Sequence, residues 1–164
     1  MIERLVSGGQ TGVDRAALDA ALALGLACGG WCPRGRRAED GPLDARYPLR
    51  ETPERAYAQR SRWNVRDADA TLLLARGAFR GGSALTRRLA RASGKPWLAL
   101  DPWEAGAAAR VRAWLAAERV RVLNVAGPRE SQEPGVYARA RALLGEALAP
   151  APASPPDPRG GERA

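Results

Sequence analysis

Histidine is absent from this sequence of 164 residues, and its absence excludes several kinds of chemistry. Histidine is the commonest general base and metal ligand near neutral pH, and it activates most serine and cysteine nucleophiles. The only two cysteines, Cys28 and Cys32, are too few for a disulfide framework or a four-ligand zinc site. We therefore expect no structural metal, and we interpret both cysteines as small buried apolar residues.

Long hydrophobic runs are also missing. No stretch approaches the roughly 18 consecutive apolar residues that a membrane-spanning helix needs. The N-terminal segment MIERLVSGG lacks the basic region and apolar run of a signal peptide. The hydrophobic content of 45% is ordinary for a globular protein. We therefore expect a soluble, cytoplasmic protein with no membrane contact.

Lysine is nearly absent although the sequence is strongly basic. There are 26 basic and 18 acidic residues, and Lys95 is the only lysine. A net charge of +8 is compatible with nucleic-acid binding, because clustered cations neutralise phosphates. The arginines are spread along the chain, however, in doublets no longer than Arg36-Arg37 and Arg87-Arg88. A small anionic ligand accounts for them equally well, so nucleic acid is the less favoured partner.

Apolar strand-like segments alternate with helical patterns up to residue 148. Strands are predicted at 5–6, 27–31, 70–75, 96–100 and 120–126, and helices at 11–24, 52–66, 83–92, 104–118 and 135–148. We expect Thr52 to be the N-cap of the second helix, with Pro53 at its first position. Such alternation produces right-handed crossovers and a sheet covered on both faces. The predicted fold class is α/β, a three-layer sandwich with a mostly parallel sheet.

The sequence predicts one domain followed by a tail. Residues 1–148 carry the strand and helix patterns, whereas residues 149–164 are rich in proline and glycine and lack a periodic apolar face. We expect this tail to be disordered. Residues 32–51 form a long polar connection inside the domain, and connections of that length are usually functional or mobile.

Three glycine-containing loops follow predicted strands, at residues 7–12, 76–83 and 126–131. In an open parallel sheet, ligands bind beyond the carboxyl ends of the strands, where such loops converge. Glycines let the backbone approach a ligand closely, and free N–H groups at a helix start attract anions. Each loop alone is compatible with an ordinary turn. Three of them on one rim predict a ligand pocket.

The first loop matches neither of two well-known nucleotide loops. It lacks the Gly-Lys-Ser/Thr of a P-loop, which disfavours ATP hydrolysis. It reads G-G-x-x-G instead of G-x-G-x-x-G, and residues 31–34 stand where an acidic residue would hold the ribose of NAD. Asp14 is compatible with two roles: favourable interaction with the helix dipole, or contact with a ligand hydroxyl or amino group. Arg15 could neutralise an anion, and Glu130 allows the same two alternatives as Asp14.

Six segments occur in order along the chain: SGGQTGVDRAALDAAL, GWCPRGRRAEDG, YPLRET, NVRDADATLLL, RGGSALT and VLNVAGPRES. Together they resemble the family of candidate molybdenum cofactor carriers, a circularly permuted YpsA branch of the SLOG superfamily. The resemblance covers residues 3–148. It implies a Rossmann-like fold, a pocket for a phosphorylated pterin or nucleotide-like ligand, and assembly into a homo-oligomer.

The resemblance also implies which residues bind the ligand. They are Gly8, Gly9, Gln10, Thr11 and Gly12, then Gly81, Gly82, Ser83 and Thr86, and then Gly127, Glu130 and Ser131, to which we add Asp14 and Arg15. The implied ligand is molybdenum cofactor (molybdopterin), which a carrier protects and passes to molybdoenzymes. Cys28 or Cys32 could steady its molybdenum because thiolates are soft ligands, although their spacing does not require it.

Two other functions are compatible with the sequence. LOG-type phosphoribohydrolases of the same superfamily use a glutamate in a G-G-x-G-T-x-x-E loop, but here residues 81–86 are followed by Arg87-Arg88. A nucleotide-processing hydrolase would need another carboxylate, such as Asp14 or Glu130. A DNA-binding module similar to the DprA proteins would use the arginine surplus. The missing glutamate favours a non-catalytic binding protein, so we assign no catalytic residue.

Overall fold

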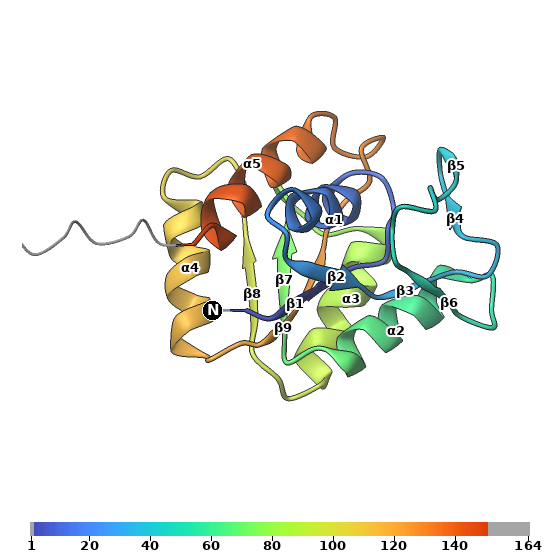
Figure 1. The fold of residues 1–164 in the computed structure, drawn as a ribbon, viewed down its shortest axis with the longest axis horizontal. Helices are drawn as coiled ribbons and strands as arrows, with labels where there is room; N and C mark the ends of the chain where they lie inside the picture. The colour runs from blue at the N-terminus through green and yellow to red at the C-terminus, as the bar shows by residue number, and fades with distance from the viewer. Residues whose placement is uncertain (1, 151–164) are drawn as a thin grey trace, which may run out of the picture.

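Five parallel strands form the central sheet of the computed structural model, which describes residues 2–150 (Figure 1). In sheet order they are β2 (Ala27–Gly29), β1 (Arg4–Val6), β9 (Val122–Ala126), β7 (Ala70–Leu74) and β8 (Trp97–Leu100). The chain leaves β1 toward one edge of the sheet and leaves β7 toward the other. The loops after these strands therefore diverge around the end of β9, the position where ligands bind in open α/β sheets.

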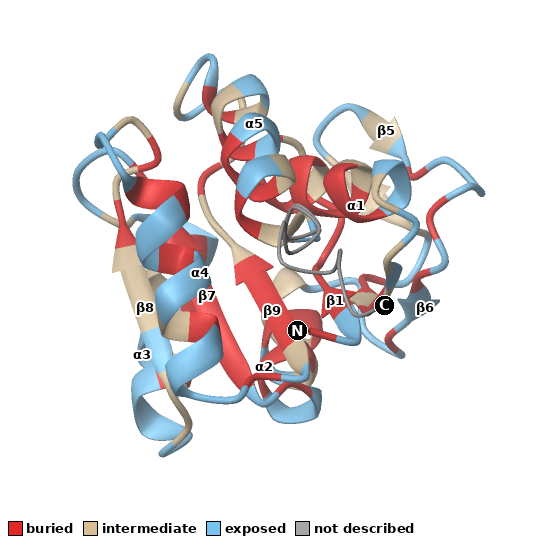
Figure 2. Ribbon diagram, turned by 60° about the vertical axis from the view of Figure 1, so that its left-hand side comes forward, coloured by how far each residue is buried: buried red, intermediate tan, exposed pale blue. Residues whose placement is uncertain are grey.

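Five helices cover the two faces of the sheet, which confirms the predicted α/β sandwich with its Rossmann-like arrangement. They are α1 (Val13–Ala23), α2 (Tyr57–Asp67), α3 (Gly81–Ala92), α4 (Ala107–Ala117) and α5 (Val136–Leu148). Helices α1, α4 and α5 lie on one face, and α2 and α3 lie on the other (Figures 1 and 2).

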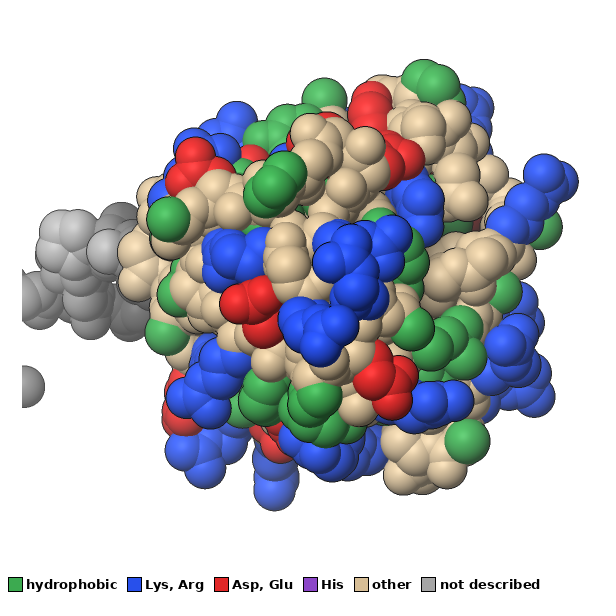
Figure 3. Space-filling view, turned by 90° about the vertical axis from the view of Figure 1, so that its right-hand side faces the viewer, with side chains coloured by type: hydrophobic (Ala, Val, Ile, Leu, Met, Phe, Trp, Pro, Cys, Tyr) green, Lys and Arg blue, Asp and Glu red, His purple; other side chains and the backbone are tan. Residues whose placement is uncertain are grey.

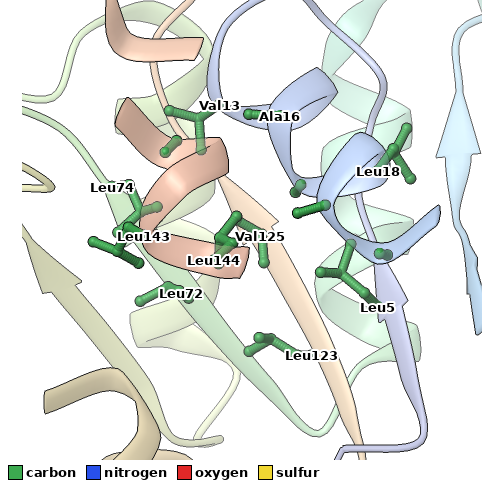
Figure 4. Packing of buried hydrophobic residues seen from close by; sticks show 14 of the residues in the cluster. Leu5, Val13, Ala16, Leu18, Leu72, Leu74, Leu123, Val125, Leu143 and Leu144 are labelled. Atoms are coloured by element: carbon green, nitrogen blue, oxygen red, sulfur yellow. The ribbon is translucent and has the colours of Figure 1, made fainter. Parts of the chain in front are cut away.

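The core lies between the sheet and the α1–α5 pair (Figure 4). All five residues of β7 are buried, as expected for an apolar run in the middle of a parallel sheet. Helix α1 presents buried alanines to its neighbours, and these small side chains let α5 approach closely. The larger fully buried side chains include Leu5, Val13, Leu18, Leu72, Leu123, Val125 and Leu144.

The segment between β2 and α2 differs from the single loop that we expected. It contains four strands of two residues each, β3 (Trp31–Cys32), β4 (Arg37–Ala38), β5 (Gly41–Pro42) and β6 (Arg50–Glu51). Strand β3 pairs with β6 in parallel, and β4 pairs with β5 as an antiparallel hairpin. The strand predicted at 27–31 is divided at Gly30, whose φ of +121° turns the chain out of the central sheet.

Helix α2 begins at Tyr57, so the prediction that Thr52 is its N-cap is wrong. Thr52 is buried, and its amide donates to the carbonyl oxygen of Cys32 at 2.8 Å. This bond extends the pairing of β3 with β6, and the tertiary contact overrides the local capping pattern. The remaining predicted elements agree with the structure to within about three residues at each end, the usual uncertainty of such boundaries.

The predicted tail at 149–164 lies outside the described residues, except for Ala149 and Pro150. None of the helices within residues 2–150 has the length and apolar character that crossing a membrane requires.

Candidate ligand-binding site

The loops that follow β1, β7 and β9 meet at the carboxyl edge of the sheet, around one cavity. Nine residues from the three loops and the helix starts after them line it: Gly8, Gln10, Asp14, Gly82, Ser83, Thr86, Gly127, Arg129 and Gln132. Seven of these nine belong to the predicted ligand set. The three predicted loops are therefore neighbours in space, although their binding of a ligand stays a prediction.

Helix α2 supplies a further wall that the sequence analysis missed. Its residues Tyr57, Arg60, Ser61 and Asn64 line the same cavity. The last three are buried, so the helix presents a polar face toward the sheet where an apolar stripe is usual. Polar residues at 60, 61 and 64, on one side of a helix, were a signal that could have identified this wall.

Arg60 and Asp14 form an ion pair at the base of the cavity. Arg60 Nη1 donates to Asp14 Oδ2 at 2.7 Å, and their side chains are only 11% and 5% exposed. Asp14 lies in the first turn of α1, as its helix-dipole role requires, and its carboxylate also neutralises a buried arginine. A buried ion pair is expensive to desolvate, so it contributes little net stability and suggests another use for these charges.

Two buried nitrogen atoms at this cavity have no hydrogen-bond partner among the described residues. They are Gln10 Nε2 and Arg60 Nε. A buried donor without a partner costs about 1–3 kcal/mol, and native proteins rarely retain one without a reason. Because both residues line the cavity, an anionic group bound there is a candidate partner for these donors.

Thr11 and Ser131, both predicted to bind the ligand, contact an acidic side chain instead. Their hydroxyls donate to the carboxylate of Glu39, which stands at the turn between β4 and β5. The hydrogen bonds from Ser131 and Thr11 hold the pKa of Glu39 below its ordinary value. Glu39 was not identified from the sequence, because nothing local marks a carboxylate in a polar loop as a partner of two distant hydroxyls.

Arg15 and Glu130 lie away from the main cavity and line a second one with Asp19, Tyr47 and Tyr137. Arg15 makes two hydrogen bonds to Asp40, at 2.9 and 3.0 Å, and they lower the pKa of that carboxyl group.

The carboxylate of Glu130 accepts from the amides of Gly135 and Tyr137, at 2.6 and 2.9 Å, where α5 begins. Of its two alternatives, the structure thus favours the interaction with a helix start.

The glycines have different positions within the predicted set. Gly12 is the point where the first and third loops touch, because a Cβ there would stand 2.3 Å from the carbonyl oxygen of Pro128. Gly9 packs against Leu49 and Leu43, and Gly81 is exposed at the start of α3. These three glycines shape the loops, whereas Gly8, Gly82 and Gly127 lie on the wall of the cavity.

Cys28 and Cys32 lie in β2 and β3, apart from the residues that line the cavity. Both are free thiols, and burial raises the pKa of each, which favours the neutral thiol over the thiolate that binds metals. Within residues 2–150, no three His, Cys, Asp or Glu side chains are grouped closely enough to hold a metal ion.

Three arginines lie around the ring of Tyr57, which lines the cavity. The Cζ atoms of Arg37, Arg60 and Arg129 lie 5.1, 5.7 and 5.1 Å from the ring centroid, and they come from three different segments. Figure 3 shows one face of the molecule, on which basic side chains form separate groups with acidic and apolar ones between them. At the cavity itself, the three arginines place positive charge around Tyr57, which favours an anion.

Comparisons with known proteins give two matches. A family model described as the circularly permutated YpsA SLOG family matches residues 5–148. The crystal structure of a candidate molybdenum carrier protein from Syntrophus aciditrophicus SB is similar, with a TM-score of 0.86 and 40% sequence identity. The match covers 90% of this chain and 96% of that one. No curated protein gives a significant match.

Proposed function

The chain belongs to the circularly permuted YpsA SLOG family, and we propose that it is a carrier that binds molybdenum cofactor through the phosphate of the pterin. The observation that carries this proposal is the pair of buried, unpartnered donors at the cavity, Gln10 Nε2 and Arg60 Nε. A phosphate group would satisfy both donors, and the charge of Arg60 would strengthen its hydrogen bond.

The other walls of the cavity fit a phosphate joined to a flat polar ring. Gly8, Gly82 and Gly127 allow the backbone to approach the phosphate oxygens. Tyr57 and two of the arginines around it line the cavity with planar groups and hydrogen-bond donors, which suits a pterin or a purine ring. The bound cofactor would supply the molybdenum, and the residues of this chain would hold its phosphate.

The positions of the acidic residues support binding over hydrolysis. Asp14 is engaged with Arg60 at the base of the cavity, and Glu130 lines the other cavity with its carboxylate directed to the start of α5. General acid–base cleavage requires a carboxylate placed next to the reacting bond. Of the two carboxylates that a hydrolase could use, one is therefore paired with an arginine and the other lies at a different cavity, which supports binding over hydrolysis.

The proposal includes passage of the cofactor to molybdoenzymes in the cytoplasm and assembly of the chain into a homo-oligomer, as the family resemblance implies. Loaded protein should restore activity to a cofactor-free molybdoenzyme faster than free cofactor does. Light scattering should give a mass that is a multiple of 17.5 kDa. A monomeric mass together with no transfer would limit the protein to ligand binding.

Ligand identity and site are tested together. Protein purified from cells that make molybdenum cofactor is denatured, and the released small molecules are analysed by mass spectrometry. Binding of inorganic phosphate is then measured by calorimetry for the wild type, Arg60→Lys and Gln10→Glu. Lysine keeps a cation beside Asp14 but lacks the Nε donor, and glutamate keeps the acceptor oxygen of Gln10 but lacks Nε2. We expect each variant to lose at least about tenfold in affinity.

The matched control is Arg62→Lys, because Arg62 is an exposed arginine of the same helix. Its phosphate affinity should equal that of the wild type. Recovery of no pterin or nucleotide, combined with no phosphate binding, would overturn the proposal. Affinity for single-stranded DNA that falls steeply with salt would instead support the DNA-binding alternative.

A further inference from the structure

The carboxylate of Glu39 occupies a group of donors that comes from the first and third loops. The hydroxyls of Thr11 and Ser131 donate to it, the latter at 2.6 Å, and the amide of Ser131 donates at 3.4 Å. Arg129 Nη1 lies 4.0 Å from Glu39 Oε2. Because these hydrogen bonds lower the pKa of Glu39, the donors surround a full negative charge at neutral pH.

The same donors would bind a phosphate group. Two hydroxyls, a backbone amide and a guanidinium at a loop rim are groups that proteins use to hold phosphate oxygens, and a carboxylate accepts the same hydrogen bonds. Thr11 and Ser131, which the family resemblance implies as ligand residues, both contact an anion in the structure. That anion is a side chain of the protein itself.

This group of donors adjoins the main cavity through two shared residues. Arg129 lines the cavity and also lies beside Glu39. Gln10 accepts the amide of Glu39 on Oε1 at 2.9 Å, while its buried Nε2 is the unpartnered donor at the cavity. Two anionic groups, one in the cavity and one in the place of Glu39, would therefore be neighbours.

The turn that carries Glu39, residues 39–40, is exposed, whereas Ala38 and Leu43 beside it pack against the hydrophobic core. Strands β4 and β5 pair through only two residues each and project from the side of the molecule (Figure 1). A hairpin of this kind has little stability of its own in water. Besides Glu39, its turn is attached through the exposed carboxylate of Asp40, which pairs with Arg15. A competing anion would thus have to replace polar contacts of the exposed turn, and the packed residues beside it could stay in place.

We propose that Thr11, Ser131 and Arg129 form a second anion subsite, which Glu39 occupies in this structure and from which the second phosphate of a diphosphate-containing ligand displaces it. The inference rests on the proposed function, because the subsite adjoins the cavity that is proposed to bind the first phosphate. It narrows the ligand class to pterins or nucleotides that carry two adjacent phosphate groups. Displacement of the Glu39 carboxylate releases the β4–β5 turn from Thr11 and Ser131.

Calorimetry with inorganic phosphate and inorganic pyrophosphate tests the subsite, on the wild type, Glu39→Gln and Ser131→Ala. Glu39→Gln removes the competing charge, so pyrophosphate should bind about tenfold more tightly while phosphate affinity stays within about twofold. Ser131→Ala removes the hydroxyl that donates to the anion and keeps the backbone amide, so pyrophosphate should bind more weakly. If Glu39 only anchored the hairpin, both variants would loosen it and change affinity in the same direction.

Two further measurements complete the test. Asp44→Asn removes one negative charge from the same segment, where Asp44 contacts the amide of Arg46, and should leave the pyrophosphate affinity unchanged.

Hydrogen exchange at residues 37–42 of the wild type should become faster with pyrophosphate and not with phosphate. Slower exchange, or equal pyrophosphate affinity in wild type and Glu39→Gln, would overturn the second subsite alone. Failure of the wild type to bind phosphate would overturn the proposed function as well.

Discussion

The guanidinium of Arg60 lies directly over the Cα of Gly8, so closely that a Cβ on Gly8 would stand 1.3 Å from Arg60 Nη1. Arg60 comes from α2, and Gly8 comes from the loop after β1. The missing side chain at Gly8 is therefore what lets the cation cross the loop and reach Asp14. This contact explains why a glycine stands at a position where the backbone has no need of a positive φ.

Gly8→Ala should weaken both anion binding and the fold. The added methyl group occupies the place of the guanidinium, so Arg60 must leave Asp14 or shift its whole side chain. We expect phosphate affinity, measured by calorimetry, to fall at least about tenfold. The free energy of unfolding in urea should fall by about 1–3 kcal/mol, as in other overpacked sites.

Gly145→Ala is the matched control. Gly145 lies within α5, and a Cβ there would meet nothing within 4 Å. Alanine is a better helix former, so the free energy of unfolding should rise by about 0.5–1 kcal/mol with phosphate affinity unchanged. If Gly8→Ala behaved like this control, Arg60 would not depend on Gly8 for its position.

Asp14→Asn should destabilise the protein because it leaves Arg60 buried and unpaired. Removing one partner of a buried ion pair costs about 3–5 kcal/mol in the free energy of unfolding, measured by urea titration. The double variant Asp14→Asn/Arg60→Met should recover much of that loss, since the uncompensated charge is gone. Added phosphate should stabilise Asp14→Asn more than the wild type, because the anion takes the place of the carboxylate. Equal stabilisation would show that phosphate does not contact Arg60.

The sequence predicts the three loops because their signals are local. A buried apolar run such as β7, followed by glycines and a helical pattern, marks both a strand and the loop at its carboxyl end. Parallel topology then places such loops on one rim. The strand and loop signals need only neighbouring residues, and the alternation of strands and helices along the chain predicts the parallel topology.

The contacts that complete the site are not local, so the sequence does not reveal them. Arg60 meets Asp14 across 46 residues, and Glu39 meets Ser131 across 92. An arginine in a polar helix and a glutamate in a polar loop have the composition of exposed residues, and only the packing of α2 and the hairpin against the rim gives them partners. Thr52 was misassigned for the same reason, since its pairing with Cys32 arises from the tertiary structure.

Glu130→Gln tests whether Glu130 binds the ligand, as the sequence predicts, or stabilises the start of α5, which its carboxylate contacts. The carboxylate accepts two backbone amides at the start of α5, so loss of its charge should lower the free energy of unfolding by about 1 kcal/mol. Phosphate affinity should not change, because Glu130 lies at the other cavity. Glu146→Gln, an exposed glutamate later in α5, should alter neither quantity. A fall in phosphate affinity for Glu130→Gln alone would place Glu130 in the site, as the sequence predicted.

Asp19 joins two tyrosines at the second cavity, and this arrangement predicts a loss of stability in alkaline solution. The hydroxyls of Tyr137 and Tyr47 donate to its two oxygens at 2.6 and 2.8 Å. Burial, together with the hydrogen bond to Asp19, raises the pKa of Tyr137 from 10.0 to about 12. The folded state therefore favours the neutral phenol, and the phenolate forms first in the unfolded chain.

The sign of the effect follows from linkage. Below pH 10 the contribution of Tyr137 to the free energy of unfolding is complete, and it is lost as the pH rises from 10 to about 12. Urea titrations of the wild type across that interval should show stability falling with pH, and Tyr137→Phe should fall less steeply because it has no proton to lose at this position. The absorbance of the phenolate should show that Tyr137 ionises at a higher pH than an exposed tyrosine. Identical slopes for the wild type and Tyr137→Phe would mean that Asp19 does not hold the phenol in its neutral form.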